Sequence, residues 1–316
     1  MKHTPFDGSS KPFTTGLTQL DPDRWIEPDE ALDFYLSEKE LLLSSRRDSV
    51  FAAEPGTEAA QREMLWNLTD YLVCRYPHIY RREGNRMVIA GRQVALDGDA
   101  PILAAGSLIQ DDLAILELKE GAWRLTAAYV AFPSSWSLAE KFGRSMDEIH
   151  APVPGFEAGT RNAELITRMF DRLSPDRFVE RFNWAINVDG ALHLPKSKSE
   201  GIGTGAVALT EDGTFIRVER QTLRKLPQTG AIVFTIRIYS DPLAALRRRS
   251  DAPALAQSFI AQLHELTLPQ AAYKGLVSKR DALIAALASI AGSARSEIAV
   301  DPPALYCDTK LCSRAD

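Results

Sequence analysis

The sequence predicts an α+β protein in which an antiparallel sheet of about five or six strands is surrounded by helices. Two β-rich runs lie between residues 215 and 239 and are joined by a turn that contains Pro227 and Gly230. Shorter alternating runs predict strands at 123–132 and 181–188. Outside these strands, amphipathic stretches predict helices at 28–46, 58–77, 159–175, 242–266 and 269–291.

The remaining elements complete one compact unit. A short hairpin over 87–96 turns at Gly91, and Pro101 is expected to open a helix that continues to residue 118. Residues 1–28 are rich in Pro, Gly, Thr and Asp and are expected to wrap the body as an N-terminal arm. Because no repeat and no linker is apparent, residues 29–292 are predicted to form a single domain, followed by a tail over 293–316.

The segment 132–156 delivers one histidine, His150, from the end of a short helix into a turn. Ser137 and Glu140 form a capping box that starts this helix, and two prolines after it keep the exit rigid. An imidazole held in this way suits the role of ligand to a large planar cofactor. The alternative is an ordinary histidine near a helix end, which on spacing alone is the more common case.

The first strand of the 215–239 pair carries charged and polar side chains on both faces. Alternation places Arg217, Glu219 and Gln221 on one face, and Val218, Arg220 and Thr222 on the other. A solvated antiparallel sheet explains polar residues on one face but not on both. Arginines at these positions would suit carboxylates, which a guanidinium binds in a bidentate way.

Composition excludes several classes of protein. The 316-residue chain has a formal net charge of −5, which argues against general nucleic-acid binding because such proteins usually carry a basic excess. No segment has the length and apolarity of a membrane span, and the N-terminus has no apolar signal region. A cytoplasmic location is therefore expected, with no membrane partner.

Two weaker signals lie in the second half of the chain. Cys307 and Cys312 could form a metal-binding pair, but two thiols with four residues between them are a poor indication. The glycine-rich stretch 201–205 resembles a phosphate loop only superficially and is interpreted as a mobile loop.

Several segments resemble, in order, those of a known family, over about residues 15 to 276. The matching stretches are GLTQLDPDRWIEPDE, IQDDLAIL, FPSSWSLAEKFGRSMDEIHAPVPGF, RFNWAI, RVERQTLRKLPQTGAIVFTIRIY and YKG. They are similar to the family that contains the α subunit of the heme-dependent oxidative N-demethylase. Asp111 and Asp112 stand where that family has an acidic pair, commonly with Glu first. The IHAPVPGF and RVERQTLRKLP motifs are long and unusual, which makes the resemblance specific.

The resemblance implies a PAS-like antiparallel sheet with added helices and a noncovalently bound heme b over the sheet. His150 would be the proximal iron ligand, and the RVERQTLRKLP segment, which includes Gln221, would line the heme pocket. Arg217, Arg220 and Arg224 would be candidates for contacts to the heme propionates. Glu219 would recognise the amine substrate, or it would instead form a salt bridge with Arg217 or Arg220.

The implied activity is oxidative removal of a methyl group from a small secondary amine such as dimethylamine, with O2 consumed and formaldehyde released. Such a monooxygenase needs electrons, and the chain carries no flavin or nicotinamide signature. A separate NADPH-dependent reductase with flavin and iron–sulfur centres is therefore implied as partner. Two other readings stay open: a PAS-type heme sensor of gas or redox state, and a heme-free relative that acts as an interaction module.

Overall fold

The computed structural model describes residues 1–195 and 209–293. The glycine-rich stretch 201–205, the two C-terminal cysteines at 307 and 312, and nearly all of the predicted tail lie outside the described residues.

One seven-stranded antiparallel sheet runs through the molecule in the order β1-β8-β9-β10-β6-β7-β2. This confirms the predicted α+β class with a large antiparallel sheet. Its strands are β1 (Thr18–Leu20), β2 (Phe51–Ala53), β6 (Asp112–Lys119), β7 (Ala122–Tyr129), β8 (Phe178–Asn187), β9 (Phe215–Lys225) and β10 (Ile232–Pro242). The longest pairing joins β9 to β10 over eleven residues, from Phe215 opposite Pro242 to Lys225 opposite Ile232. A second, three-stranded sheet contains β3 (Tyr80–Glu83), β4 (Arg86–Ile89) and β5 (Arg92–Ala95).

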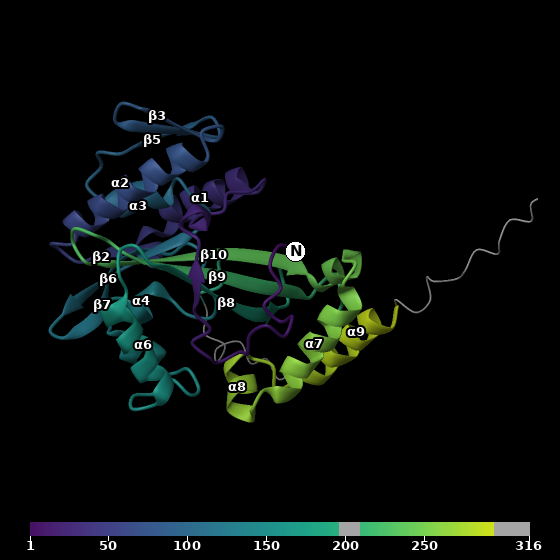
Figure 1. Cartoon of the computed structure of the whole chain (residues 1–316). Helices are drawn as coiled ribbons and strands as arrows, with labels where there is room; N and C mark the ends of the chain where they lie inside the picture. The colour runs from purple at the N-terminus through teal and green to yellow at the C-terminus, as the bar shows by residue number, and fades with distance from the viewer. Residues whose placement is uncertain (196–208, 294–316) are drawn as a thin grey trace, which may run out of the picture.

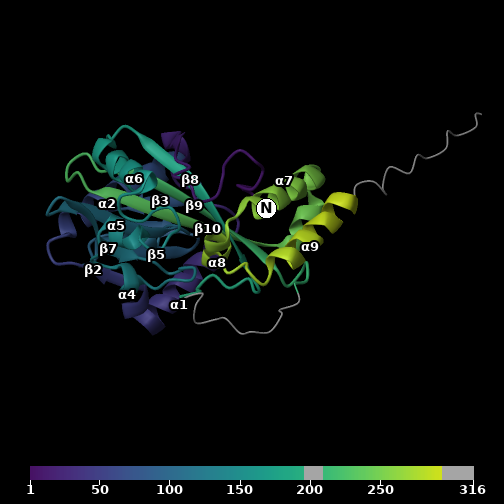
Figure 2. The same ribbon diagram turned by 90° about the horizontal axis from the view of Figure 1, so that it is seen from below.

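Helices cover both faces of the large sheet (Figure 1). In that view α1 (Leu32–Val50), α2 (Glu58–Arg75), α3 (Pro101–Gly106) and the small sheet lie above it. Below it are α4 (Leu138–Lys141), α5 (Met146–His150) and α6 (Arg161–Arg172), which Figure 2 shows from underneath. At the far end of the long strands are α7 (Ala252–Glu265), α8 (Leu268–Tyr273) and α9 (Arg280–Ser293). The described residues also contain two short 3₁₀ helices, η1 (Pro22–Arg24) and η2 (Leu243–Arg248). No described helix is both long and apolar enough to cross a membrane.

Three clusters of buried apolar side chains hold these layers together. The first includes Trp25 and lies between the sheet and α1–α3. The second includes Trp184 and joins the C-terminal helices to β8 and β9. The third includes Trp123 and lies between the sheet and α4–α6. Because all three clusters rest on the same sheet, residues far apart in sequence can meet on either of its faces.

The predicted helix over 101–118 is wrong in its second half. The helix α3 ends at Gly106, and Asp112–Lys119 forms β6, which pairs with β10 on one side and β7 on the other. Residues 112–116 are buried because both faces of this central strand are covered. The sequence of such a strand is a continuous apolar run, and the spacing of its apolar residues cannot distinguish it from a buried helix.

The predicted His150 helix is two short helices. The Ser137–Glu140 capping box starts α4, as expected, but Gly143 has a positive φ of 74° and breaks the helix. A second capping box, made by Ser145 and Glu148, starts α5. The two long helices predicted near the C-terminus are also divided, into η2 with α7 and into α8 with α9.

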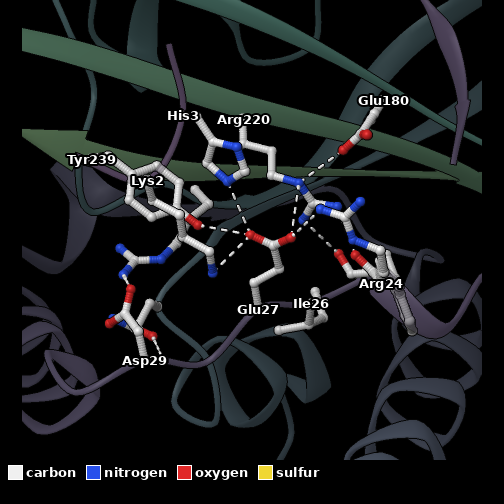
Figure 3. A network of polar contacts seen from close by, with 12 residues as sticks. Lys2, His3, Arg24, Ile26, Glu27, Asp29, Glu180, Arg220 and Tyr239 are labelled. Carbon is white, nitrogen blue, oxygen red and sulfur yellow. Dashed lines mark hydrogen bonds and ion pairs between the residues drawn. The ribbon is translucent and has the colours of Figure 1, made fainter. Parts of the chain in front are cut away.

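The N-terminal arm is attached to the body through Glu27, a buried residue in the segment before α1 (Figure 3). The Glu27 carboxylate, 8% exposed, accepts hydrogen bonds from His3 at 3.0 Å and Tyr239 at 3.2 Å. Its other close partners are cationic: Lys2 at 2.9 Å and Arg24 at 3.1 Å, with Arg220 at 3.9 Å. One carboxylate thus connects the start of the chain to β9 and β10.

Candidate functional site

Polar side chains gather on the face of the sheet that α4–α6 cover. We call them the lower-face cluster: Lys141 from α4, His150 from α5, Arg181 and Asn183 from β8, Glu219 and Gln221 from β9, and Tyr273 from α8. Register explains the contribution of the strands. Arg181 stands opposite Gln221, and Asn183 stands opposite Glu219, so the four side chains share one face.

His150 is held with one ring nitrogen unprotonated. Its Nδ1–H donates to the carbonyl oxygen of Met146, one turn earlier in α5, at 2.9 Å. The Phe156 ring stacks beside it at 6.1 Å between centroids. Burial lowers the pKa of His150 to about 4, and the positive charges of Lys141 and Arg181 act in the same direction. The imidazole is therefore neutral at pH 7 and presents the Nε2 lone pair, the form that binds metals.

Glu219 is oriented by neutral neighbours. Its Oε2 accepts from the Gln221 amide at 2.9 Å and from the Asn183 amide at 3.3 Å. No salt bridge from Glu219 to Arg217 or Arg220 occurs in the described part of the chain. Both arginines have other partners, so the alternative of a structural ion pair at Glu219 is not observed.

Two cations of the cluster have no anionic partner in contact among the residues that the structure describes. Lys141 lies 4.8 Å from the centroid of the Trp136 ring and makes no salt bridge to any described residue. Arg181 donates no hydrogen bond within residues 1–195 and 209–293, and its Nε is enclosed. Burial lowers the pKa of both groups, and the charge of Glu219 opposes that shift.

The arginines that the sequence singled out are divided between the two faces of β9. Arg217 shares the face of Glu219 but is completely buried, where it donates to the carbonyl oxygens of Phe132 at 2.6 Å and Leu192 at 3.0 Å. Arg220 and Arg224 lie on the opposite face. Arg220 binds Glu180 at 2.9 Å and two backbone carbonyls, and Arg224 binds Asn67 at 2.8 Å. The fold therefore brings His150, Glu219, Gln221 and Arg217 to one side and separates the other two arginines from them.

A cavity of about 410 Å³ adjoins the lower-face cluster at the edge of β8. The N-terminal arm forms one wall of it and β8 forms the other, and the lining includes Lys2, Lys11, Phe13, Arg181, Asn183 and Trp184. Two residues of the cluster, Arg181 and Asn183, also line this cavity.

The lower-face cluster suits the heme that the family resemblance implies. A porphyrin supplies four of the iron ligands itself and needs only one or two from the protein, and His150 offers one. Three cations interact electrostatically with Glu219, which is the only carboxylate of the cluster: Lys141, Arg181 and Arg217. Such an excess of positive charge fits a cofactor that carries carboxylates.

Sequence reasoning missed Lys141, Arg181 and one further histidine. Arg181 and Asn183 alternate on the predicted strand 181–188, but only the pairing of β8 with β9 places them beside Glu219. His193 also bonds through Nδ1 to a backbone carbonyl, that of Ala131 at 2.8 Å. Its Nε2 is enclosed and has no hydrogen-bond partner among the described residues. It is therefore a second histidine with the geometry of a ligand.

A family model matches residues 16–284, which is most of the chain. Its description is "Haem-dependent oxidative N-demethylase, alpha subunit-like". The match agrees with the motifs at His150 and along β9, and the description implies heme dependence and assembly with other subunits for the family. The chain belongs to the heme-dependent oxidative N-demethylase alpha-subunit-like family.

Proposed function

We propose that the protein binds a noncovalent heme b through His150 Nε2 and oxidatively demethylates a small secondary amine. The observation that carries the proposal is the hydrogen bond from His150 Nδ1 to Met146, which leaves Nε2 unprotonated on the same face as Glu219. A backbone carbonyl that fixes the tautomer of a ligand histidine is the common arrangement at metal sites.

The heme carboxylates need cationic partners, and Lys141 is the best placed. Arg220 and Arg224 lie on the other face of β9, and Nη1 and Nη2 of Arg217 already donate to backbone carbonyl oxygens. Lys141 interacts electrostatically with His150 and makes no salt bridge in the described residues. Of the predicted propionate contacts, the proposal therefore keeps Arg217 as a supporting charge and adds Lys141.

Glu219 would recognise the protonated amine. Because Asn183 and Gln221 both donate to its Oε2, the Oε1 atom is left to accept from a substrate ammonium. When bound, the heme supplies the binding and activation of O2. The net reaction consumes the amine, O2, two electrons and two protons, and yields the demethylated amine, formaldehyde and water. The electrons would come from a separate NADPH-dependent flavin and iron–sulfur reductase, in keeping with a family described as an alpha subunit.

The test is the absorption spectrum of the purified protein, supplied with heme, before and after addition of dimethylamine. We expect a Soret band that shifts with the amine. Glu219→Gln should abolish the shift and leave heme content unchanged. If the Soret band of the wild type does not shift when amines are added, a heme sensor would be favoured. The absence of any Soret band would favour a heme-free interaction module.

A further inference from the structure

Glu219 and Arg181 form an anion–cation pair that is held apart. They lie diagonally on adjacent strands, since Arg181 stands opposite Gln221 and Glu219 stands opposite Asn183. Their charges interact, yet no salt bridge joins them in the described structure. The Glu219 carboxylate is instead turned toward the two amides of Asn183 and Gln221.

The state of Arg181 is unusual for a half-buried guanidinium. The group has five N–H donors. Arg181 makes no hydrogen bond to a described residue, and its Nε is buried without a partner. Buried charged donors are normally paired, because leaving them without a partner is costly. An acceptor that is not part of this chain would satisfy them, and a carboxylate matches the guanidinium best because it can bind through two parallel hydrogen bonds.

From this arrangement we infer that the substrate is a zwitterion, an N-methylated amino acid whose ammonium group contacts Glu219 and whose carboxylate contacts Arg181. The inference rests on the proposed function, which supplies the N-demethylation. Dimethylamine could satisfy only Glu219 and would leave the guanidinium unpaired. For the smallest member of the class, N-methylglycine, O2 with two electrons and two protons would give glycine, formaldehyde and water.

The adjoining space and charge agree with a small zwitterion. The cavity of about 410 Å³ is lined by Arg181 and Asn183 and lies within the usual size range of small-molecule sites. Its other two cationic lining residues are already paired: Lys2 with Glu27 at 2.9 Å and Lys11 with Glu265 at 3.2 Å. Of the described cations that line this cavity, Arg181 is thus the one left to bind a carboxylate.

The test is calorimetric titration of the heme-loaded protein with N-methylglycine, dimethylamine and acetate. N-methylglycine should bind about 10- to 100-fold more tightly than dimethylamine, since it adds a charge-assisted bidentate contact. Arg181→Gln should remove this advantage. Lys11→Gln is the matched control, because it removes a positive charge from the lining of the same cavity and should preserve the advantage.

Three results would overturn the inference: equal affinity for N-methylglycine and dimethylamine, an Arg181→Gln variant that keeps the wild-type preference, or one that loses heme instead. The last result would make Arg181 a partner of the heme carboxylates. Because heat is measured rather than turnover, failure of the proposed function is seen separately, as a wild-type protein without a Soret band. Arg181→Lys provides a second variant: it keeps the charge, loses the bidentate geometry and should retain only part of the preference.

Discussion

Lys39 is a charged side chain at the centre of the protein, on the opposite face of the sheet from the lower-face cluster. It is 1% exposed, and its ammonium donates to the carbonyl oxygens of Gly106 at 2.9 Å and Ile109 at 3.1 Å, and to that of Asp111. Burial lowers its pKa to about 8, while Asp112 and Asp111 oppose the shift, so it remains protonated at neutral pH. One ammonium thus supplies the hydrogen-bond donors for three backbone carbonyl groups between the end of α3 and the start of β6.

Replacing Lys39 by Met should destabilise the fold by roughly 3–5 kcal/mol, because three buried carbonyl groups lose their donor. Urea unfolding at pH 7 measures the change. Lys119→Met is the control, since Lys119 is half-exposed and paired with Glu54 at 2.7 Å, and it should cost at most about 1 kcal/mol. Equal losses in the two variants would contradict the central role of Lys39.

Glu27 makes stability depend on pH in the acid range. Burial raises the pKa of this carboxyl, but hydrogen bonds and charges from His3, Arg220 and Lys2 outweigh burial and hold the pKa well below its usual range. The folded state therefore binds this proton less readily than the unfolded state. Its contribution is present above the unfolded pKa of about 4.3 and is lost as pH falls toward the folded pKa.

We expect Glu27→Gln to be less stable than the wild type at pH 7, by about 3 kcal/mol, and to lose less stability between pH 5 and pH 3. Urea unfolding at several pH values compares the two slopes. Parallel slopes would show that Glu27 is not the group that titrates. Faster hydrogen exchange in residues 1–14 of the variant would show that the arm has been released.

At the scale of elements, α3 and β7 approach closely at Gly106. A Cβ atom built on Gly106 would lie 2.3 Å from Cδ1 of Tyr129. Tyr129 is fully buried, and its hydroxyl donates to the backbone carbonyl oxygen of Lys39 at 3.0 Å. Gly106→Ala should therefore cost about 1–3 kcal/mol through overpacking. Gly98→Ala, which meets no atom within 4 Å, should change stability by less than about 0.5 kcal/mol. Thermal unfolding of the two variants would test the contrast.

Short sequence patterns predicted where several helices and strands lie better than they predicted which strands pair in the sheet. The capping box at Ser137 and the alternation along β9 were enough to place a helix start and to separate Glu219 from Arg220. The same sequence could not show that β6 is a strand, because its apolar run fits either structure. It also could not place Arg181 beside Glu219, since that contact depends on which strands pair across the sheet.

At the scale of the molecule, one sheet supports all three apolar clusters, and each cluster contains a buried tryptophan. This continuity favours the proposal that residues 29–292 form a single domain. We expect tryptophan fluorescence and far-ultraviolet circular dichroism to report the same urea transition. Two separated transitions would instead indicate that the C-terminal helices unfold as an independent unit.

The proposed heme site depends on His150 as the iron ligand, and two histidine variants test this role. The Soret band of the heme-loaded protein is recorded for the wild type, His150→Ala and His193→Ala. We predict that His150→Ala loses or shifts the band, that free imidazole restores it, and that His193→Ala keeps the wild-type spectrum. An unchanged spectrum in His150→Ala, or loss of the band in His193→Ala alone, would contradict the account and move the iron ligand elsewhere.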